Sequence, residues 1–177
     1  MAYLGLLRRR PHERAGFALY AAVVGAARDP ALYGDVGVPD TLEGRFDLVA
    51  LHVALMVKRV RNDPDPRGAA LAQAVFDAMI SDLDLNLREM GVGDMSIGKR
   101  VKRMWEAFHG RALAYEAALA AGDRGALEEA LARNVWRGAP PEGAVARLAD
   151  HALALDAALT AEPFEGLVAG RALGAAP

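Results

Sequence analysis

Apolar side chains recur every three or four residues along most of this sequence, and short segments rich in Gly and Pro interrupt the pattern. That spacing places side chains on one face of an α-helix, whereas a strand needs strict alternation, which the sequence lacks. We therefore predict an all-α fold, a single bundle-like helical domain of about six helices over residues 12–161. Residues 1–11 are predicted to be a flexible N-terminus, and residues 162–177 a loose, flexible tail.

The Gly and Pro breaks set the predicted helix boundaries. The helices are expected at about residues 12–27, 38–60, 69–90, 95–121, 124–136 and 142–161, with a turn of helix and an ordered loop at 31–38. Asp40, followed by Glu43, is typical of a capping box before the second helix, which is apolar nearly all round and should be central. Asp123 is a candidate cap for the fifth helix.

The third predicted helix ends at a pair of glycines. Gly91 is expected to take the left-handed conformation just past the helix end, and Gly93 to keep the loop tight. Asp94 or Ser96 is the expected cap of the helix that follows.

Composition narrows the function. The chain is 53% hydrophobic and 25% charged, as is usual for a globular protein, and its net charge of −2 gives no general attraction to DNA. The absence of cysteine excludes disulfides, thiol nucleophiles and Cys-ligated metals. Apolar runs stay well short of the roughly 20 residues of a membrane span. We expect a soluble cytoplasmic protein, with an alternative peripheral contact at the inner face of the cytoplasmic membrane through Leu4, Leu6, Leu7 and Arg8–Arg10.

Charged side chains are densest where the third predicted helix gives way to the fourth. Acidic residues come first and basic ones open the next helix: Asp77, Asp82, Asp84, Glu89 and Asp94, with Arg88 among them, precede Lys99, Arg100, Lys102 and Arg103. The carboxylates lack the spacing of a calcium loop or of paired Glu-x-x-His metal ligands, and no phosphate-binding glycine loop accompanies them. We expect no enzyme activity, no catalytic residue, no metal and no cofactor. Two alternatives stay open, a helical module that binds RNA or the ribosome and, less favoured, a carboxylate-based metal protein.

Three polar side chains share one line of the second predicted helix. Arg45, His52 and Arg59 are spaced seven residues apart, which gives them nearly the same direction around the helix axis. A buried cation needs a carboxylate partner, so we favour an ion-pair seam with the acidic flank of the third helix. A binding site for an anionic group is the alternative.

Several short segments carry a family resemblance. They are Val38-Pro-Asp-Thr-Leu-Glu-Gly-Arg-Phe46, Leu51-His52, Phe76-Asp-Ala-Met79, Asp82-Leu-Asp84, Asn86-Leu-Arg-Glu-Met-Gly-Val-Gly-Asp94, Gly98-Lys99 and Phe108-His-Gly-Arg111 followed by Tyr115. In order and spacing they resemble the ubiquinol–cytochrome c chaperone family, the relatives of mitochondrial Cbp3, over roughly residues 18–119. The chain looks like a bacterial member.

The resemblance implies an all-helical, non-enzymatic assembly factor. Mitochondrial members bind newly made cytochrome b and help deliver it to the bc1 complex, acting with a small partner protein near the ribosomal tunnel exit. Cytochrome b is therefore the implied client, and the ribosome or a small helper protein is a further candidate partner. The residues expected to form or support the partner-facing surface are Asp77, Asp82, Asp84, Arg88, Glu89 and Asp94, with Arg45, His52 and Lys99 as second choices. Exposed apolar side chains near them, such as Leu85, Met95 or Trp105, would form a groove that shields an apolar client.

Overall fold

The computed structural model describes residues 12–91 and 93–172. Within these residues the regular structure is entirely helical: α1 (Glu13–Ala27), α2 (Pro30–Gly34), α3 (Leu42–Arg61), α4 (Gly68–Glu89), α5 (Asp94–Ala121), α6 (Arg124–Trp136), α7 (Ala144–Ala161) and α8 (Phe164–Val168). Six of these helices are long, and α2 and α8 have five residues each. The all-α prediction is confirmed, and the six long helices lie close to their predicted positions.

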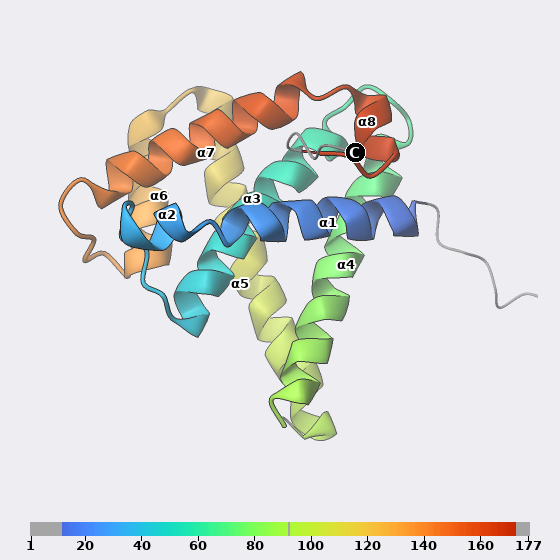
Figure 1. The fold of residues 1–177 in the computed structure, drawn as a ribbon, viewed down its shortest axis with the longest axis horizontal. Coiled ribbons are helices and arrows are strands. Elements are labelled where there is room, and N and C mark those ends of the chain that lie inside the picture. The colour runs from blue at the N-terminus through green and yellow to red at the C-terminus, as the bar shows by residue number, and fades with distance from the viewer. Residues whose placement is uncertain (1–11, 92, 173–177) are drawn as a thin grey trace, which may run out of the picture.

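Helix α3 is the central helix of the fold, as its apolar sequence predicts. It packs against α1, α4, α5, α6 and α7, which lie around it in Figure 1. Leu48, Leu51, Leu55 and Met56 are completely or almost completely buried within these contacts. Because full burial of such a side chain contributes about 1.5–3 kcal/mol, α3 is a major source of the folding free energy.

A buried carboxylate ties α3 to two later helices. Asp47 has no exposed surface, and its two carboxylate oxygens accept hydrogen bonds from Arg111 at 2.8 Å and Arg137 at 2.9 Å. Arg111 belongs to α5, and Arg137 directly follows α6. The pair of guanidinium groups compensates the cost of burying this charge and fixes where α5 and α6 sit on α3.

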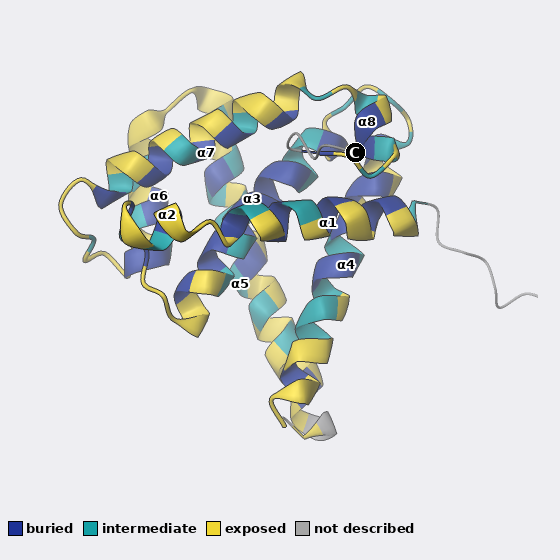
Figure 2. Ribbon diagram, in the orientation of Figure 1, coloured by how far each residue is buried: buried dark blue, intermediate teal, exposed yellow. Residues whose placement is uncertain are grey.

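Helices α4 and α5 form a hairpin that projects from the rest of the molecule (Figure 1), and its far end is largely exposed (Figure 2). Gly91 has a φ of 75°, so the predicted left-handed residue after α4 is confirmed. The predicted cap of α5, Asp94 or Ser96, is wrong, because Gly93 occupies the capping position. The side chain of Asp94 lies outside the part of the chain that the structure describes.

Two other predicted caps have different outcomes. The cap of α3 is Thr41, whose hydroxyl accepts the backbone N–H of Gly44 at 3.1 Å, so the predicted cap Asp40 is wrong by one residue. A side chain at position 44 would place its Cβ 2.0 Å from a backbone oxygen, so glycine is required there. Asp123 caps α6 as predicted, by accepting the backbone N–H of Ala126.

The predicted loose tail, residues 162–177, needs a correction in its first part. Residues 164–168 form α8, which packs against α1, and Leu167 and Ala172 are buried. Residues 173–177 lie outside the described residues, as do the predicted flexible N-terminus, residues 1–11, and its membrane contact. No helix in the described part of the chain is both long and apolar enough to cross a membrane.

Candidate functional site

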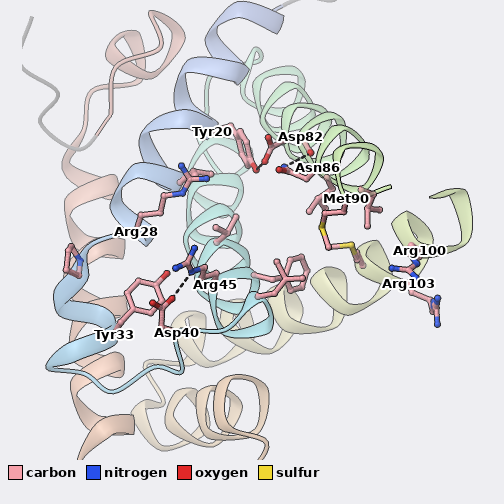
Figure 3. Close-up of a pocket in the computed structure, with 18 residues that line it drawn as sticks. Tyr20, Arg28, Tyr33, Asp40, Arg45, Asp82, Asn86, Met90, Arg100 and Arg103 are labelled. Atoms are coloured by element: carbon pink, nitrogen blue, oxygen red, sulfur yellow. Dashed lines mark hydrogen bonds and ion pairs between the residues drawn. The ribbon is translucent and has the colours of Figure 1, made fainter. Parts of the chain in front are cut away.

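A groove of about 840 Å³ lies where five helices meet. Its walls come from the C-terminal half of α1, from α2, from the start of α3, from the C-terminal half of α4 and from the first part of α5 (Figure 3). Below, "the groove" means this cavity. Its volume is within the range of known ligand pockets, so it has room for several side chains of a partner.

The walls of the groove are mainly apolar. Phe46 and Val49 of α3 face it together with Leu83 and Leu87 of α4. Leu42 and Met90 also line the groove and keep 63% and 58% of their surface exposed. Exposed side chains of this size gain roughly 25 cal/mol for each Å² that a partner covers. The groove is therefore suited to hold an apolar segment.

Charged side chains surround this apolar surface. Four arginines line the groove, Arg28, Arg45, Arg100 and Arg103, together with two carboxylates, Asp40 and Asp82. Arg45 Nε donates to Asp40 Oδ1 at 2.7 Å, and this hydrogen bond lowers the pKa of Asp40. The arginines therefore outnumber the carboxylates, and the side chains around the groove carry a net positive charge.

The second carboxylate, Asp82, accepts a hydrogen bond from a tyrosine. Tyr20 of α1 donates its phenolic proton to Asp82 Oδ2 of α4 at 2.6 Å. Burial is the larger cause, and this hydrogen bond the second, of a raised pKa of the Tyr20 phenol. The phenol therefore stays protonated and keeps donating.

Comparison with known proteins connects this architecture to a family. The family model described as ubiquinol-cytochrome C chaperone matches residues 34–174, which is most of the chain. The chain belongs to the ubiquinol-cytochrome C chaperone family. Among solved structures, this chaperone is similar to the crystal structure of the Cbp3 homolog from Brucella abortus, with 35% sequence identity and a TM-score of 0.79. The match covers 92% of this chain and 91% of that one. No curated protein matches significantly.

The family match extends beyond the segment that carries the resemblance in the sequence. That resemblance covers about residues 18–119, whereas the matched range runs from the end of α2 through α8. The helices α6, α7 and most of the groove, from α3, α4 and α5, thus fall inside the family-matched range of this chaperone. Helix α1, with Tyr20 and Arg28, precedes it.

The groove brings together two of the residues expected at the partner-facing surface of this chaperone. Arg45 and Asp82 both line it, on α3 and α4. The partner-facing role of all nine residues stays a prediction, and most of the other seven lie elsewhere. Asp77 is half-buried and accepts from Gln73 at 2.8 Å, and it lines a smaller cavity of about 320 Å³ between α1 and α4. Asp84 and Arg88 pair along α4 at 2.7 Å. Glu89 and Lys99 are exposed at the far end of the hairpin.

The predicted ion-pair seam between α3 and the acidic flank of α4 is wrong. Arg45 pairs with Asp40, which is five residues away on its own chain segment. Arg59 pairs with Asp63 at 2.6 Å and also donates to two backbone carbonyls near the end of α7. The line of polar residues on α3 therefore faces α7 over much of its length.

His52, expected as a second-choice surface residue, is fully buried. Its Nδ1 lies 2.8 Å from the Leu48 carbonyl oxygen, which accepts only, so Nδ1 carries the proton in the neutral ring. Its Nε2 is then an acceptor and lies 3.0 Å from Nε2 of His151 in α7, which must donate. Burial lowers the pKa of His52 to about 4, so the ring is neutral near pH 7. His52 thus fastens α7 to α3 and does not reach the surface.

Several groove residues escaped the sequence analysis. Leu85 and Trp105, expected to line an apolar groove, are exposed on the hairpin but do not line this cavity, and the side chain of Met95 is not described. Leu42 was the available signal of this groove, since it is a large apolar residue in the polar first turn of α3.

Among the described residues, no three His, Asp or Glu side chains gather as a metal site would require.

Proposed function

We propose that this chaperone binds newly made cytochrome b through the groove and holds it until it joins the bc1 complex. Membership of the ubiquinol-cytochrome C chaperone family carries the first part of this proposal. The groove supports the second part, because cytochrome b is an apolar client and the groove offers accessible apolar walls. In this proposal the chaperone works on the cytoplasmic side of the membrane, where it meets the client before the client is fully inserted.

The exposed apolar side chains of the groove are the most direct support for client binding. Leu42, at the start of α3, and Met90, directly after α4, both line the groove and present more than half of their surface to solvent. An apolar client segment that fills the groove would cover surface of both side chains.

Deletion of the gene tests the proposed function. Membranes of the deletion strain are expected to lose cytochrome b and assembled bc1 complex, measured from absorbance spectra and by protein mass spectrometry. A wild-type copy should restore both, whereas a copy with Leu42→Gln and Met90→Gln should restore neither fully. Unchanged cytochrome b and bc1 levels in the deletion strain would contradict the proposal.

A matched control uses exposed apolar residues outside the groove. Leu113 and Leu153 have 53% and 37% of their surface exposed and do not line the groove. A copy with Leu113→Gln and Leu153→Gln removes similar apolar surface and should restore bc1 fully. If both double variants fail equally to restore bc1, the groove is not the binding site for the client.

The ribosome is a second candidate partner, favoured by the basic face of the hairpin. Lys99, Arg100, Lys102 and Arg103 are all exposed on the first part of α5. Such a patch attracts RNA phosphates in a salt-dependent way. Co-sedimentation with ribosomes should fall when all four are changed to Glu, and unchanged co-sedimentation would exclude this contact.

A further inference from the structure

The positive charge around the groove is not neutralised within the described part of the chain. Arg45 is paired with Asp40, so Asp82, which accepts from the neutral phenol of Tyr20, is the one carboxylate left among the lining residues to offset the other three arginines. Arg28, Arg100 and Arg103 are exposed and have neither a hydrogen bond nor an ion pair among the described residues. Three free guanidinium groups therefore border an apolar cavity.

These arginines come from different walls of the groove. In Figure 3, Arg28, which directly follows α1, lies on the side of Arg45, whereas Arg100 and Arg103 of α5 lie across the groove, with Met90 between the two groups. An apolar segment in the groove would have its flanking residues close to these cations. Acidic flanks would gain charge-assisted hydrogen bonds, and basic flanks would meet like charge.

We propose that the groove selects an apolar client segment that carries acidic residues beside its apolar stretch. This inference rests on the proposed function and specifies the chemistry of the client segment. Membrane segments generally carry an excess of Lys and Arg at their cytoplasmic ends. The arginines therefore also reject most other membrane segments, which gives the chaperone a means of discrimination that an apolar groove alone lacks.

The placement of the charges favours a peptide over a lipid bilayer as the occupant. A protein lies on an anionic membrane with its cations on one shared face, beside apolar side chains that enter the interface. Here the cations stand on opposite walls and border a cavity that is deep enough to take side chains. A chain segment can enter between the walls, whereas a bilayer surface cannot.

Binding of synthetic peptides to the full chain tests the inference. The peptides share one fluorescent apolar core and differ only in their flanks, which are Asp, Ser or Lys, and binding is measured by fluorescence anisotropy. The peptide with Asp flanks should bind about tenfold more tightly than the one with Lys flanks, and the difference should shrink at high salt. The variant with Arg28→Gln, Arg100→Gln and Arg103→Gln should lose this preference and still bind the Ser-flanked peptide.

The control removes the same charge elsewhere. Arg14, Arg133 and Arg171 are exposed and do not line the groove, so their triple Gln variant should keep the wild-type preference. Equal binding of all peptides to the wild type would overturn the inference and leave the proposed function standing. No saturable binding of any peptide would count against the groove itself. If the chain binds vesicles of anionic phospholipid through the arginines of the groove and shows no selectivity among the peptides, the ligand is a membrane surface and the proposed peptide ligand is wrong.

Discussion

The phenol of Tyr20 and the carboxylate of Asp82, 62 residues apart in the sequence, meet at 2.6 Å where α1 approaches α4. This hydrogen bond joins the helix that precedes the family-matched range to one wall of the groove. It also gives one oxygen of the Asp82 carboxylate a donor, while the carboxylate keeps its negative charge.

Removal of this phenol should destabilise the fold measurably. A hydrogen bond to a charged group contributes about 1.5–3 kcal/mol, so Tyr20→Phe is expected to lower the free energy of unfolding by about that amount. Tyr33→Phe is the control, since Tyr33 donates to the neutral carbonyl of Ala27 at 3.0 Å and should cost about 1 kcal/mol. Urea titration of both variants measures the difference. Equal losses would show that the charge of Asp82 adds nothing.

The crossing of α1 and α4 predicts opposite effects for two glycines of the same helix. A Cβ at Gly16 would lie 2.5 Å from a backbone carbon of Ala74, so Gly16→Ala should destabilise the protein by about 1–3 kcal/mol. A Cβ at Gly25 would meet nothing within 4 Å, so Gly25→Ala should stabilise α1 by roughly 0.5–1 kcal/mol. Thermal unfolding followed by circular dichroism compares them. A neutral Gly16→Ala would contradict the close crossing on which the shape of the groove depends.

The His52–His151 contact predicts a loss of stability in mild acid. The pKa of His52 is lowered from 6.5 to about 4 by burial, so the unfolded chain binds a proton more readily than the folded one. Stability from this group is complete above pH 6.5 and falls as the pH drops toward 4. Between pH 7 and 5 the expected loss is about 2 kcal/mol.

A variant isolates this contribution. His52→Leu should flatten the dependence of the unfolding free energy on pH between pH 7 and 5, whatever its stability at pH 7. Urea titrations at both pH values give the two slopes. Parallel slopes for wild type and variant would contradict a buried neutral His52.

The helices could be predicted because their signals are local. Apolar spacing defines a helical face, and the residues that start or end a helix, such as Asp123 and Gly91, lie within one turn of it. The same local information fails when two neighbours compete, as Thr41 and Asp40 do for the cap of α3. Residues 164–168 form a short helix that packs against α1. The sequence of the tail alone gives no sign of this contact.

The position and lining of the groove were beyond prediction because they depend on contacts between distant segments. A helical pattern identifies which side chains share a face but not which helix that face meets. His52 shares a line with Arg45, yet it meets His151, which is 99 residues away, whereas Arg45 finds a partner five residues away. Only Arg45 and Asp82 of the expected surface residues therefore reached the groove. The basic residues were recognised as a group, but the side of α5 on which Arg100 and Arg103 stand became visible only in the fold.

Cross-linking in living cells shows whether newly made cytochrome b enters the groove. A photo-reactive amino acid is placed at position 90, at the exposed edge of the groove, and at position 113 as a control outside it. After brief labelling of new proteins and irradiation, we expect a cross-link between the chaperone and newly made cytochrome b from position 90 and none from position 113. Absence of a cytochrome b cross-link from position 90, or equal cross-links from both positions, would contradict this expectation.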